Sequence, residues 1–224
     1  MSMQQVASGQ EIETKLCVPD VSVLQRRLKR LRAREISPRT HESNTLYDTP
    51  GKDLTCRGEL IRIRIEQPGT VGGRSRSAQD ATAILTYKGP SHRSRGLKKA
   101  TREPKASKRF KIRDEMEVRL DGWEQMTAIL RALGLRPVFR YEKFRTTYAL
   151  PSIRNVKVEF DETPVGLFLE LEGDEAAIDR AARLLGYSQS DYITQTYGAL
   201  YIADCRRRGI KPGDMLFPPT RKLR

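Results

Sequence analysis

Residues 11–15 read Glu11-Ile12-Glu13-Thr14-Lys15, with charged and less polar side chains in alternation. Successive side chains of a β-strand point to opposite faces, so the alternation predicts a strand over residues 10–16. The three charged residues then share one face and carry both signs of charge. On a single strand this pattern is typical of an antiparallel sheet with one side in water.

The same two-signed alternation returns on later predicted strands, whose opposite faces are mostly Ile, Val and Leu. An ordinary solvent-facing sheet is richer in Ser, Thr and Gln, so the repetition favours a sheet closed on itself. We therefore expect an α+β protein in which an antiparallel β-barrel has a charged interior and helices packed outside. The inward positions, in chain order, are Arg62, Arg64 and Glu66; Thr86 and Lys88; Arg113, Glu115, Glu117 and Arg119; Lys143, Arg145 and Thr147; Lys157, Glu159 and Asp161; and Phe168, Glu170 and Glu172.

The remaining periodicity places the other elements. Further strands are predicted over 42–48, 59–66, 82–88, 111–120, 138–148, 154–161 and 167–172. Helices are predicted over 20–34, 122–134, 174–186 and 190–204. Asp20 is a suitable N-cap for the first of them.

Composition narrows the function. The formal net charge of +14 favours anionic partners. Two histidines argue against a His-ligated zinc site or a Ser-His-Asp triad. The three cysteines, Cys17, Cys56 and Cys205, form no C-x-x-C pair and are predicted to be reduced thiols. With no signal peptide and no apolar run long enough to span a membrane, we expect a cytoplasmic protein without a membrane partner.

A charged interior is costly unless the charges are paired or bind a ligand. Converging carboxylates without His or Cys suit a hard cation, Mg²⁺ or Mn²⁺. Converging Arg and Lys suit phosphate oxygens. Both together predict a site for a metal-chelated polyphosphate.

In their order along the chain, these residues resemble the motifs of the CYTH domain, the triphosphate tunnel metalloenzymes. The resemblance spans about residues 10–204. The matching residues are Glu11, Glu13 and Lys15; Arg62 and Arg64; Thr86, Lys88 and Gly89; Glu115 and Glu117; Lys143 and Arg145; Asp161; and Gly166, Phe168, Glu170 and Glu172.

The resemblance implies a tunnel of eight antiparallel strands and a role for each motif residue. It implies that Mg²⁺ or Mn²⁺ is held by carboxylates, here Glu11, Glu13, Asp161, Glu170 and Glu172. It implies that the triphosphate is bound by Lys15, Arg62, Arg64, Lys88, Lys143 and Arg145. Lys143, with Glu115 and Glu117, is expected to act in catalysis. Arg113, Arg119, Lys157 and Glu159, which lie outside the motifs, are expected to be salt-bridge partners.

The family performs two reactions that share the metal and the clamp. Class IV adenylyl cyclases convert ATP to cyclic AMP and pyrophosphate, whereas inorganic tripolyphosphatases and thiamine triphosphatases hydrolyse a terminal phosphate. Segments 86–90, 113–148 and 158–175 resemble the CyaB-like cyclase branch more closely, so ATP is the favoured substrate. A phosphohydrolase is the alternative, and a non-catalytic polyphosphate or RNA binder is a second alternative.

The organisation predicted from these patterns has three parts. Residues 1–9 form a flexible N-terminus, 10–204 the tunnel domain, and 205–224 a basic, poorly ordered tail. An insert at about 89–111 carries nine Lys or Arg residues and one Glu. It is predicted to be a mobile loop, or alternatively an arm that binds polyanions weakly. Family members are often dimers, so a homodimer is expected.

Overall fold

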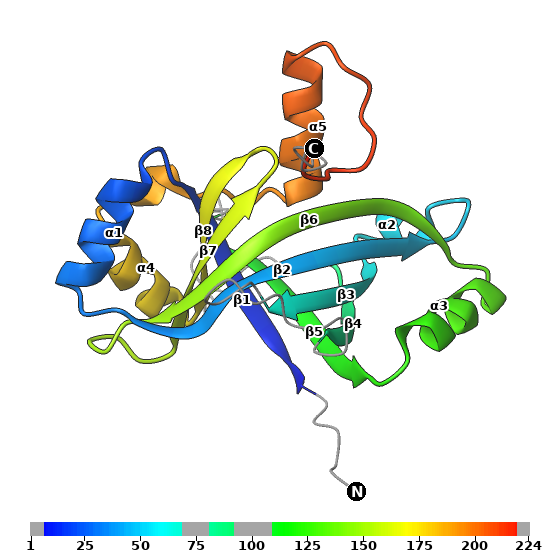
Figure 1. The fold of residues 1–224 in the computed structure, drawn as a ribbon, viewed down its shortest axis with the longest axis horizontal. Helices are drawn as coiled ribbons and strands as arrows, with labels where there is room; N and C mark the ends of the chain where they lie inside the picture. The colour runs from blue at the N-terminus through cyan, green and yellow to red at the C-terminus, as the bar shows by residue number, and fades with distance from the viewer. Residues whose placement is uncertain (1–6, 69–80, 92–108, 219–224) are drawn as a thin grey trace, which may run out of the picture.

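The computed structural model describes residues 7–68, 81–91 and 109–218. Eight antiparallel strands close into a barrel in the order β1-β5-β4-β3-β2-β6-β7-β8, with β8 returning to β1 (Figure 1). This confirms the predicted closed barrel with helices outside. The strands are β1 (Ala7–Cys17), β2 (Arg34–Asp48), β3 (Leu60–Pro68), β4 (Thr82–Lys88), β5 (Lys111–Leu120), β6 (Arg136–Ala149), β7 (Val156–Thr163) and β8 (Gly166–Gly173).

Helices surround the barrel at its two ends and along one side (Figure 1). They are α1 (Val21–Arg30), α2 (Asp53–Cys56), α3 (Trp123–Ala132), α4 (Glu175–Leu184) and α5 (Tyr197–Arg207), with a 3-10 turn at Gln189–Asp191. The carboxylate of Asp20 accepts hydrogen bonds from the backbone N–H groups of Ser22 and Val23, as its predicted capping role requires.

Helix α1 ends four residues earlier than the sequence pattern predicts. Arg32 adopts a positive φ of 53°, and the N–H of Ala33 bonds to the carbonyl of Leu28. This left-handed residue ends the helix, and the chain turns directly into β2 at Arg34. Strand β2 therefore begins well before the predicted position of 42.

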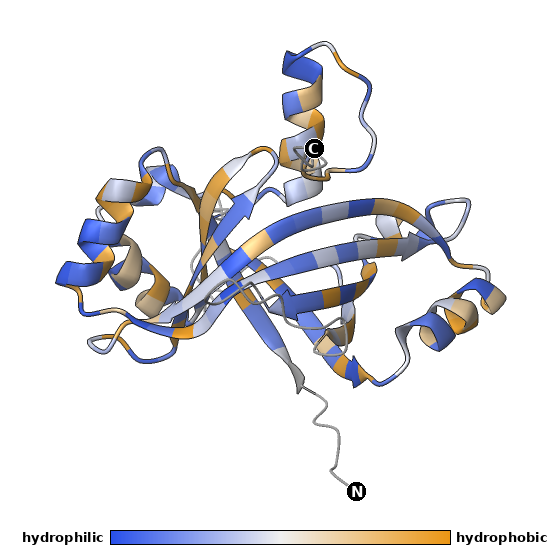
Figure 2. Ribbon diagram, viewed as in Figure 1, coloured by the Kyte–Doolittle hydropathy of each residue, from blue (hydrophilic) through white to orange (hydrophobic). Residues whose placement is uncertain are grey.

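Three apolar clusters form the core, and the two largest lie on the outer face of the barrel; the third packs Phe168, Tyr197 and Met215 together. The larger packs α1 and α4 against β1, β7 and β8, around Leu16, Val158, Leu169, Leu171 and Ile178, all fully buried. The smaller joins β2 and β3 to α2 and α3 through Tyr47, Leu54, Ile63, Leu130 and Leu135. Because the apolar faces point outward to the helices, the charged faces point inward, and polar and apolar residues alternate along the strands (Figure 2).

The chain after α4 completes one end of the barrel. Residues 192–196 are not helical, because the backbone of Ile193 exchanges two hydrogen bonds of 2.9 Å with Lys15 of β1. Beyond α5, Met215 bonds through its backbone to Arg140 and Glu142 of β6, each at 2.9 Å. Met215 is 1% exposed. The sequence pattern assigns this segment to a poorly ordered tail, whereas the structure places Met215 against β6.

Three other expectations can be placed against the structure. The predicted N-terminus of 1–9 overlaps β1, which pairs with β5 from Ala7 onward, and residues 1–6 lie outside the described part. Most of the basic insert, residues 92–108, also lies outside it. Among the described residues, no helix is long and apolar enough to cross a membrane.

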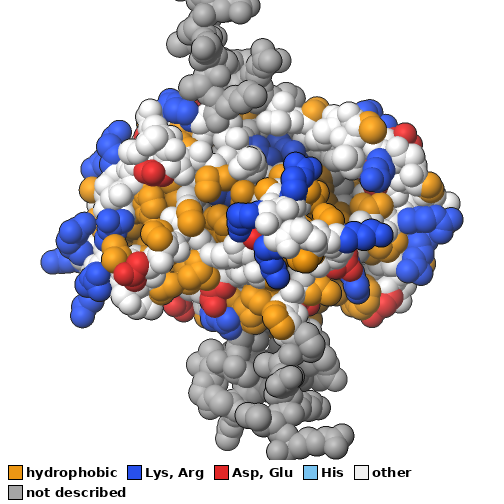
Figure 3. Space-filling model, turned by 90° about the horizontal axis from the view of Figure 1, so that it is seen from above, with side chains coloured by type: hydrophobic (Ala, Val, Ile, Leu, Met, Phe, Trp, Pro, Cys, Tyr) orange, Lys and Arg blue, Asp and Glu red, His pale blue; other side chains and the backbone are white. Residues whose placement is uncertain are grey.

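Lys and Arg side chains are spread across the face seen from above, with hydrophobic groups between them (Figure 3).

Candidate triphosphate tunnel

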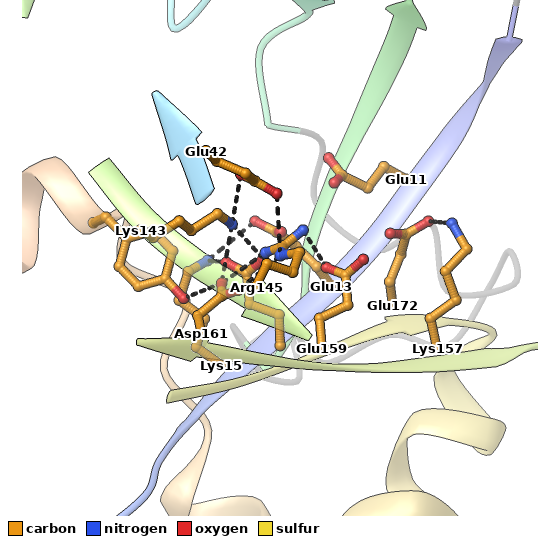
Figure 4. A network of polar contacts seen from close by, with 12 residues as sticks. Glu11, Glu13, Lys15, Glu42, Lys143, Arg145, Lys157, Glu159, Asp161 and Glu172 are labelled. Carbon is orange, nitrogen blue, oxygen red and sulfur yellow. Dashed lines mark hydrogen bonds and ion pairs between the residues drawn. The ribbon is translucent and has the colours of Figure 1, made fainter. Parts of the chain in front are cut away.

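The inner wall of the barrel carries most of the charged residues in the sequence motifs. Charges at its centre are almost completely buried: Glu13, Lys15, Lys143, Asp161 and Glu170 are each less than one-tenth exposed. Side chains of opposite sign lie against one another from strand to strand (Figure 4). Buried charges are tolerated only in this paired form.

Asp161 of β7 is the hub of this network and is 0% exposed. Its carboxylate accepts hydrogen bonds from Lys143 Nζ at 3.0 Å and from Arg145 Nε and Nη2 at 2.7 and 2.6 Å. The hydroxyl of Tyr197, at the start of α5, donates a further bond of 2.6 Å. In this state the carboxylate is committed to positioning the two cations, and its predicted role as a metal ligand stays a prediction.

A second group joins β1 to β8 and β5. Lys15 Nζ lies 2.9 Å from Glu170 and 3.4 Å from Glu13, and Lys111 Nζ lies 2.8 Å from Glu13. Burial alone would raise the pKa of Glu13, but the ammonium groups of Lys15 and Lys111 hold it well below its usual range. Both glutamates are therefore ionised.

Carboxylates crowd together where β1, β7 and β8 meet. Glu13 pairs across the sheet with Glu172, and Glu159 with Glu170. Burial raises the pKa of Glu159 to about 7, opposed by its ion pair with Arg145 and assisted by Glu170 and Glu172. Glu172 reaches outward to Lys157 at 3.1 Å, as the predicted salt-bridge role of Lys157 requires.

The facing wall carries the other predicted cations. Lys88 Nζ lies 2.6 Å from Glu11 and 3.2 Å from Glu115. Arg64 lies 3.1 Å from Glu117. Burial raises the pKa of Glu115 to about 7, opposed by Lys88 and assisted by Glu11 and Glu117.

Arg62 is held on this wall by two hydroxyl groups and by the carboxylate of Glu117, which lies 3.5 Å from its Nη2. Its guanidinium donates to the hydroxyls of Tyr141 at 3.1 Å and Thr86 at 3.2 Å. Thr86 in turn donates to Glu117 at 2.8 Å. Glu117 and Glu42 thus connect Arg62 and Arg64 to Lys143 and Arg145, whereas Lys88 pairs separately with Glu11 and Glu115. Phosphate oxygens could take over these carboxylate partners.

The donor set fits a hard divalent cation, because the glutamates that lie together on β1, β7 and β8 supply only oxygen ligands. In the arrangement described, each of these carboxylates has a Lys or Arg partner. Among the residues that the structure describes, no group of three or more His, Cys, Asp or Glu side chains is already disposed to hold a metal ion. The predicted metal ligands Glu11, Glu13, Glu170 and Glu172 stay a prediction.

Sequence patterns missed four residues of this network: Glu42, Lys111, Tyr141 and Tyr197. Lys111 and Tyr141 lie on the inward faces of β5 and β6 and could have been found by extending the alternation by one step. Glu42 of β2 is 2% exposed and lies 3.5 Å from Lys143. On the inward face of β2, Glu42 is followed by the uncharged Asn44. The alternation of acidic and basic side chains that marks other strands is therefore absent there.

The comparisons with known proteins agree with this architecture. The model of the CYTH domain matches residues 9–197. The chain belongs to the CYTH family. A "putative adenylate cyclase" of Methanocaldococcus jannaschii is 27% identical over 176 residues, which is 78% of this chain and 83% of that protein.

Two solved structures share the fold of this CYTH protein at lower identity. One is a "putative adenylate cyclase" from Vibrio parahaemolyticus, with 18% identity, a TM-score of 0.64, and coverage of 87% of this chain and 98% of that one. The other is a "putative adenylyl cyclase" from Hippeastrum, described as revealing a dominant triphosphatase activity. It has 19% identity, a TM-score of 0.55, and coverage of 90% of this chain and 97% of that one.

Proposed function

We propose that this CYTH protein is a divalent-metal-dependent enzyme that binds a triphosphate inside the tunnel and cleaves one of its phosphoanhydride bonds. The observation that carries the proposal is the buried network in which Lys15, Lys143 and Arg145 surround the carboxylates Asp161 and Glu170. A purely structural interior gains little from so many buried charges, since apolar residues fill such a space at lower cost. A site that must exchange carboxylates for phosphates does require them.

The clamp residues have distinct tasks in this proposal. The guanidinium groups of Arg62, Arg64 and Arg145 can each bind phosphate oxygens through two N–H groups, whereas Lys15, Lys88 and Lys143 act as point charges. Lys143 is held by Asp161 at 3.0 Å, which orients its ammonium group toward a scissile phosphate. Glu115 and Glu117 keep Lys88 and Arg64 in place and are the candidates for proton transfer on that wall.

Mg²⁺ or Mn²⁺ held by Glu11, Glu13, Glu170 and Glu172, with Asp161 as a further candidate, would neutralise phosphate charge during bond cleavage. The chain's own contribution is to hold the phosphates in line and to exclude water from the buried centre, where Lys15 and Asp161 are nearly inaccessible. Glu172 and Glu117 are more exposed than this centre, at 32% and 27% of their side chains.

Between the two reactions we favour the cyclase-like one, conversion of ATP to cyclic AMP and pyrophosphate. The relative from Methanocaldococcus jannaschii carries the corresponding name. The alternative is a phosphohydrolase acting on tripolyphosphate or thiamine triphosphate, and the triphosphatase activity described for the Hippeastrum protein favours it. Weak binding of polyanions by residues 89–111, a homodimer, a cytoplasmic location, and the non-catalytic binder all stay predictions.

The test is product analysis with the purified protein. ATP, tripolyphosphate and thiamine triphosphate are each incubated with Mg²⁺ or Mn²⁺, and the products are separated. We expect turnover of at least one of them, and its loss in Glu170→Gln, since Glu170 contacts Lys15 and Arg145 in the tunnel. Glu162→Gln is the matched control, because this glutamate pairs with Arg39 outside the tunnel. If all three compounds remain intact, the enzyme proposal is wrong and the non-catalytic binder gains support.

A further inference from the structure

The inner face of β2 places two polar side chains in the tunnel whose bonding is incomplete. Glu42 is 2% exposed, and its Oε2 has no hydrogen-bond partner among the described residues. Asn44 is 0% exposed, and both its Oδ1 and its Nδ2 lack partners in the same part of the chain. Within these residues, Glu42 Oε2 has only the ammonium of Lys143 near it, at 3.5 Å, and the Asn44 amide has no partner. An unpaired amide group in a buried site costs about 1–3 kcal/mol, so the pair is expected to meet a ligand.

The surroundings of Glu42 define where that ligand would sit. Its carboxylate lies 3.5 Å from Lys143 Nζ and 3.7 Å from both Arg64 Nη1 and Arg145 Nε, so it occupies the middle of the predicted clamp (Figure 4). Burial alone would raise the pKa of Glu42, but Lys143, Arg64 and Arg145 hold it well below its usual range, so the group is an anion. A phosphate placed against these cations would lie beside a carboxylate.

A phosphate oxygen cannot satisfy Glu42, because two anions repel. The missing partner must donate a hydrogen to Glu42 and accept one from the amide of Asn44. A hydroxyl group can do both, because its one hydrogen is donated to Glu42 and an oxygen lone pair accepts from Asn44 Nδ2. Asn44 lies on the same inward face, two residues along β2, and pairs across the sheet with Arg64 and Tyr141. The amide can therefore hold the second side of the same hydroxyl.

We propose that Glu42 and Asn44 form the nucleophile subsite of the tunnel, which holds a hydroxyl group beside the phosphate bound by Lys143, Arg64 and Arg145. The hydroxyl comes from water or from the sugar of a nucleoside triphosphate. The proposal rests on the proposed function and adds a residue pair that lies outside the sequence motifs.

The hydroxyl oxygen forms a bond to phosphorus, and its proton passes to the carboxylate of Glu42. The phosphorus–oxygen bond to the leaving phosphate or pyrophosphate breaks, and the leaving oxygen keeps the electron pair. When phosphates occupy Lys143, Arg64 and Arg145, these cations no longer stabilise Glu42 alone, so its carboxylate becomes a stronger base for this transfer. The proton then leaves to solvent when the products depart.

The test separates binding from chemistry. The affinity for a non-hydrolysable ATP analogue and the kcat for the triphosphate that the wild type turns over are measured for Glu42→Gln, Asn44→Ala and Glu35→Gln. Glu35 lies on β2 but is exposed, so its substitution removes the same charge outside the tunnel. We expect Glu42→Gln to lower kcat at least 100-fold with unchanged or tighter binding of the analogue, because a negative charge has left the clamp. Asn44→Ala should lower kcat about tenfold, and Glu35→Gln should match the wild type.

Retained analogue binding shows that a variant is folded. If Glu42→Gln keeps the kcat of the wild type, Glu42 only balances charge and the proposal is overturned. If the wild type itself turns over no triphosphate, the proposed function has failed, which is a different result.

The source of the hydroxyl is read from 3′-deoxy-ATP. When the wild type forms cyclic AMP from ATP and leaves 3′-deoxy-ATP intact, the subsite holds the sugar hydroxyl. When it hydrolyses both, the subsite holds water. Either outcome supports the subsite only if Glu42→Gln suppresses the same product.

Discussion

The hydroxyl of Tyr197 donates a hydrogen bond of 2.6 Å to Asp161, and this bond joins helix α5 to the ionic network inside the tunnel. The ring of Tyr197 also lies beneath the ammonium groups of Lys15 and Lys143, at 5.2 and 5.4 Å from its centroid. Burial and the neighbouring Asp161 and Glu170 hold the pKa of Tyr197 well above its usual range, so the hydroxyl stays a donor. The C-terminal helix thus supports the charges proposed to hold phosphate.

Tyr197→Phe is expected to weaken this support, because the ring contacts remain while Asp161 loses one donor. We expect the free energy of unfolding to fall by about 1–2 kcal/mol. The value of kcat/KM should fall about tenfold, as Lys143 and Arg145 become less firmly placed. Thermal denaturation and steady-state kinetics measure the two effects.

Tyr192→Phe is the matched control for this prediction. The hydroxyl of Tyr192 donates to Asp179 at 2.8 Å, away from the tunnel strands. The control should lose stability and keep its activity. Equal loss of activity in both variants would mean that Tyr197 acts only through overall stability.

Glu115 gives the tunnel a dependence of stability on pH. Burial raises its pKa to about 7, whereas the unfolded chain has a glutamate pKa of about 4.3. The folded state therefore binds a proton more readily than the unfolded state. The resulting stabilisation is fully present below about pH 4.3 and is lost as the pH rises through about 7.

Glu115→Gln should remove this dependence, since glutamine resembles the protonated acid at every pH. We expect the Tm of the variant to exceed that of the wild type by more at pH 8 than at pH 5. Glu35→Gln, on the exposed part of β2, should show no such trend. A constant Tm difference between pH 5 and pH 8 would contradict a raised pKa at Glu115.

Much of this architecture can be predicted from the sequence, because opposite charges recur at every second residue of several strands. That pattern marks the inward faces of β1, β3, β5 and β7, whereas the inward faces of β4, β6 and β8 carry charge of one sign. It fails on β2, where Glu42 and Asn44 lie inward but only one of them is charged. The spacing of charged residues along a strand shows which side chains share a face of that strand. It cannot show which other strand lies opposite that face.

Contacts between distant segments were also beyond the sequence pattern. Ile193 is extended because its backbone pairs with Lys15, although its surroundings favour a helix by composition. Met215 is buried although it stands alone in a basic, proline-containing tail. Each outcome depends on a partner at least 70 residues away, at Lys15 and at Tyr141, which local spacing does not encode.

Asp48 stabilises the turn between β2 and the short helix α2, and of these two features only the helix is absent from the sequence-based prediction. Its carboxylate accepts backbone N–H bonds from Thr49, Leu54 and Thr55 at 2.8, 2.9 and 3.0 Å. Burial alone would raise the pKa of Asp48, but these bonds and the hydroxyl of Thr55 lower it. The group therefore contributes stability above about pH 3.9, which is lost as the pH falls through its lowered pKa.

Asp48→Asn should lower the free energy of unfolding by about 1–3 kcal/mol at pH 7, because the amide accepts at one atom only. The difference from the wild type should shrink as the pH falls below about 4. Urea denaturation at pH 7 and at pH 3 measures both values. A difference that is the same at the two pH values would show that the ionised carboxylate is not what holds this turn.

Met215 tests whether the C-terminal segment is part of the folded domain. Its side chain packs with Phe168 and Tyr197, and its backbone bonds to β6 on both sides. Met215→Ala should lower the free energy of unfolding by about 2–5 kcal/mol, the usual cost of a cavity at a buried methionine. The neighbouring Leu216 is 38% exposed, so Leu216→Ala should cost less than about 1 kcal/mol.

Met215→Ala is also expected to lower the activity of the tunnel. Loss of the Met215 side chain leaves Tyr197 less firmly packed, and Tyr197 is the donor that α5 supplies to Asp161. We therefore expect Met215→Ala to lower kcat/KM in the same direction as Tyr197→Phe, with Leu216→Ala unaffected. In the double variant Met215→Ala/Tyr197→Phe, the activity losses should fall short of additive, because both act on one contact. Fully additive losses would mean that the tail and the Tyr197 hydroxyl support the tunnel independently.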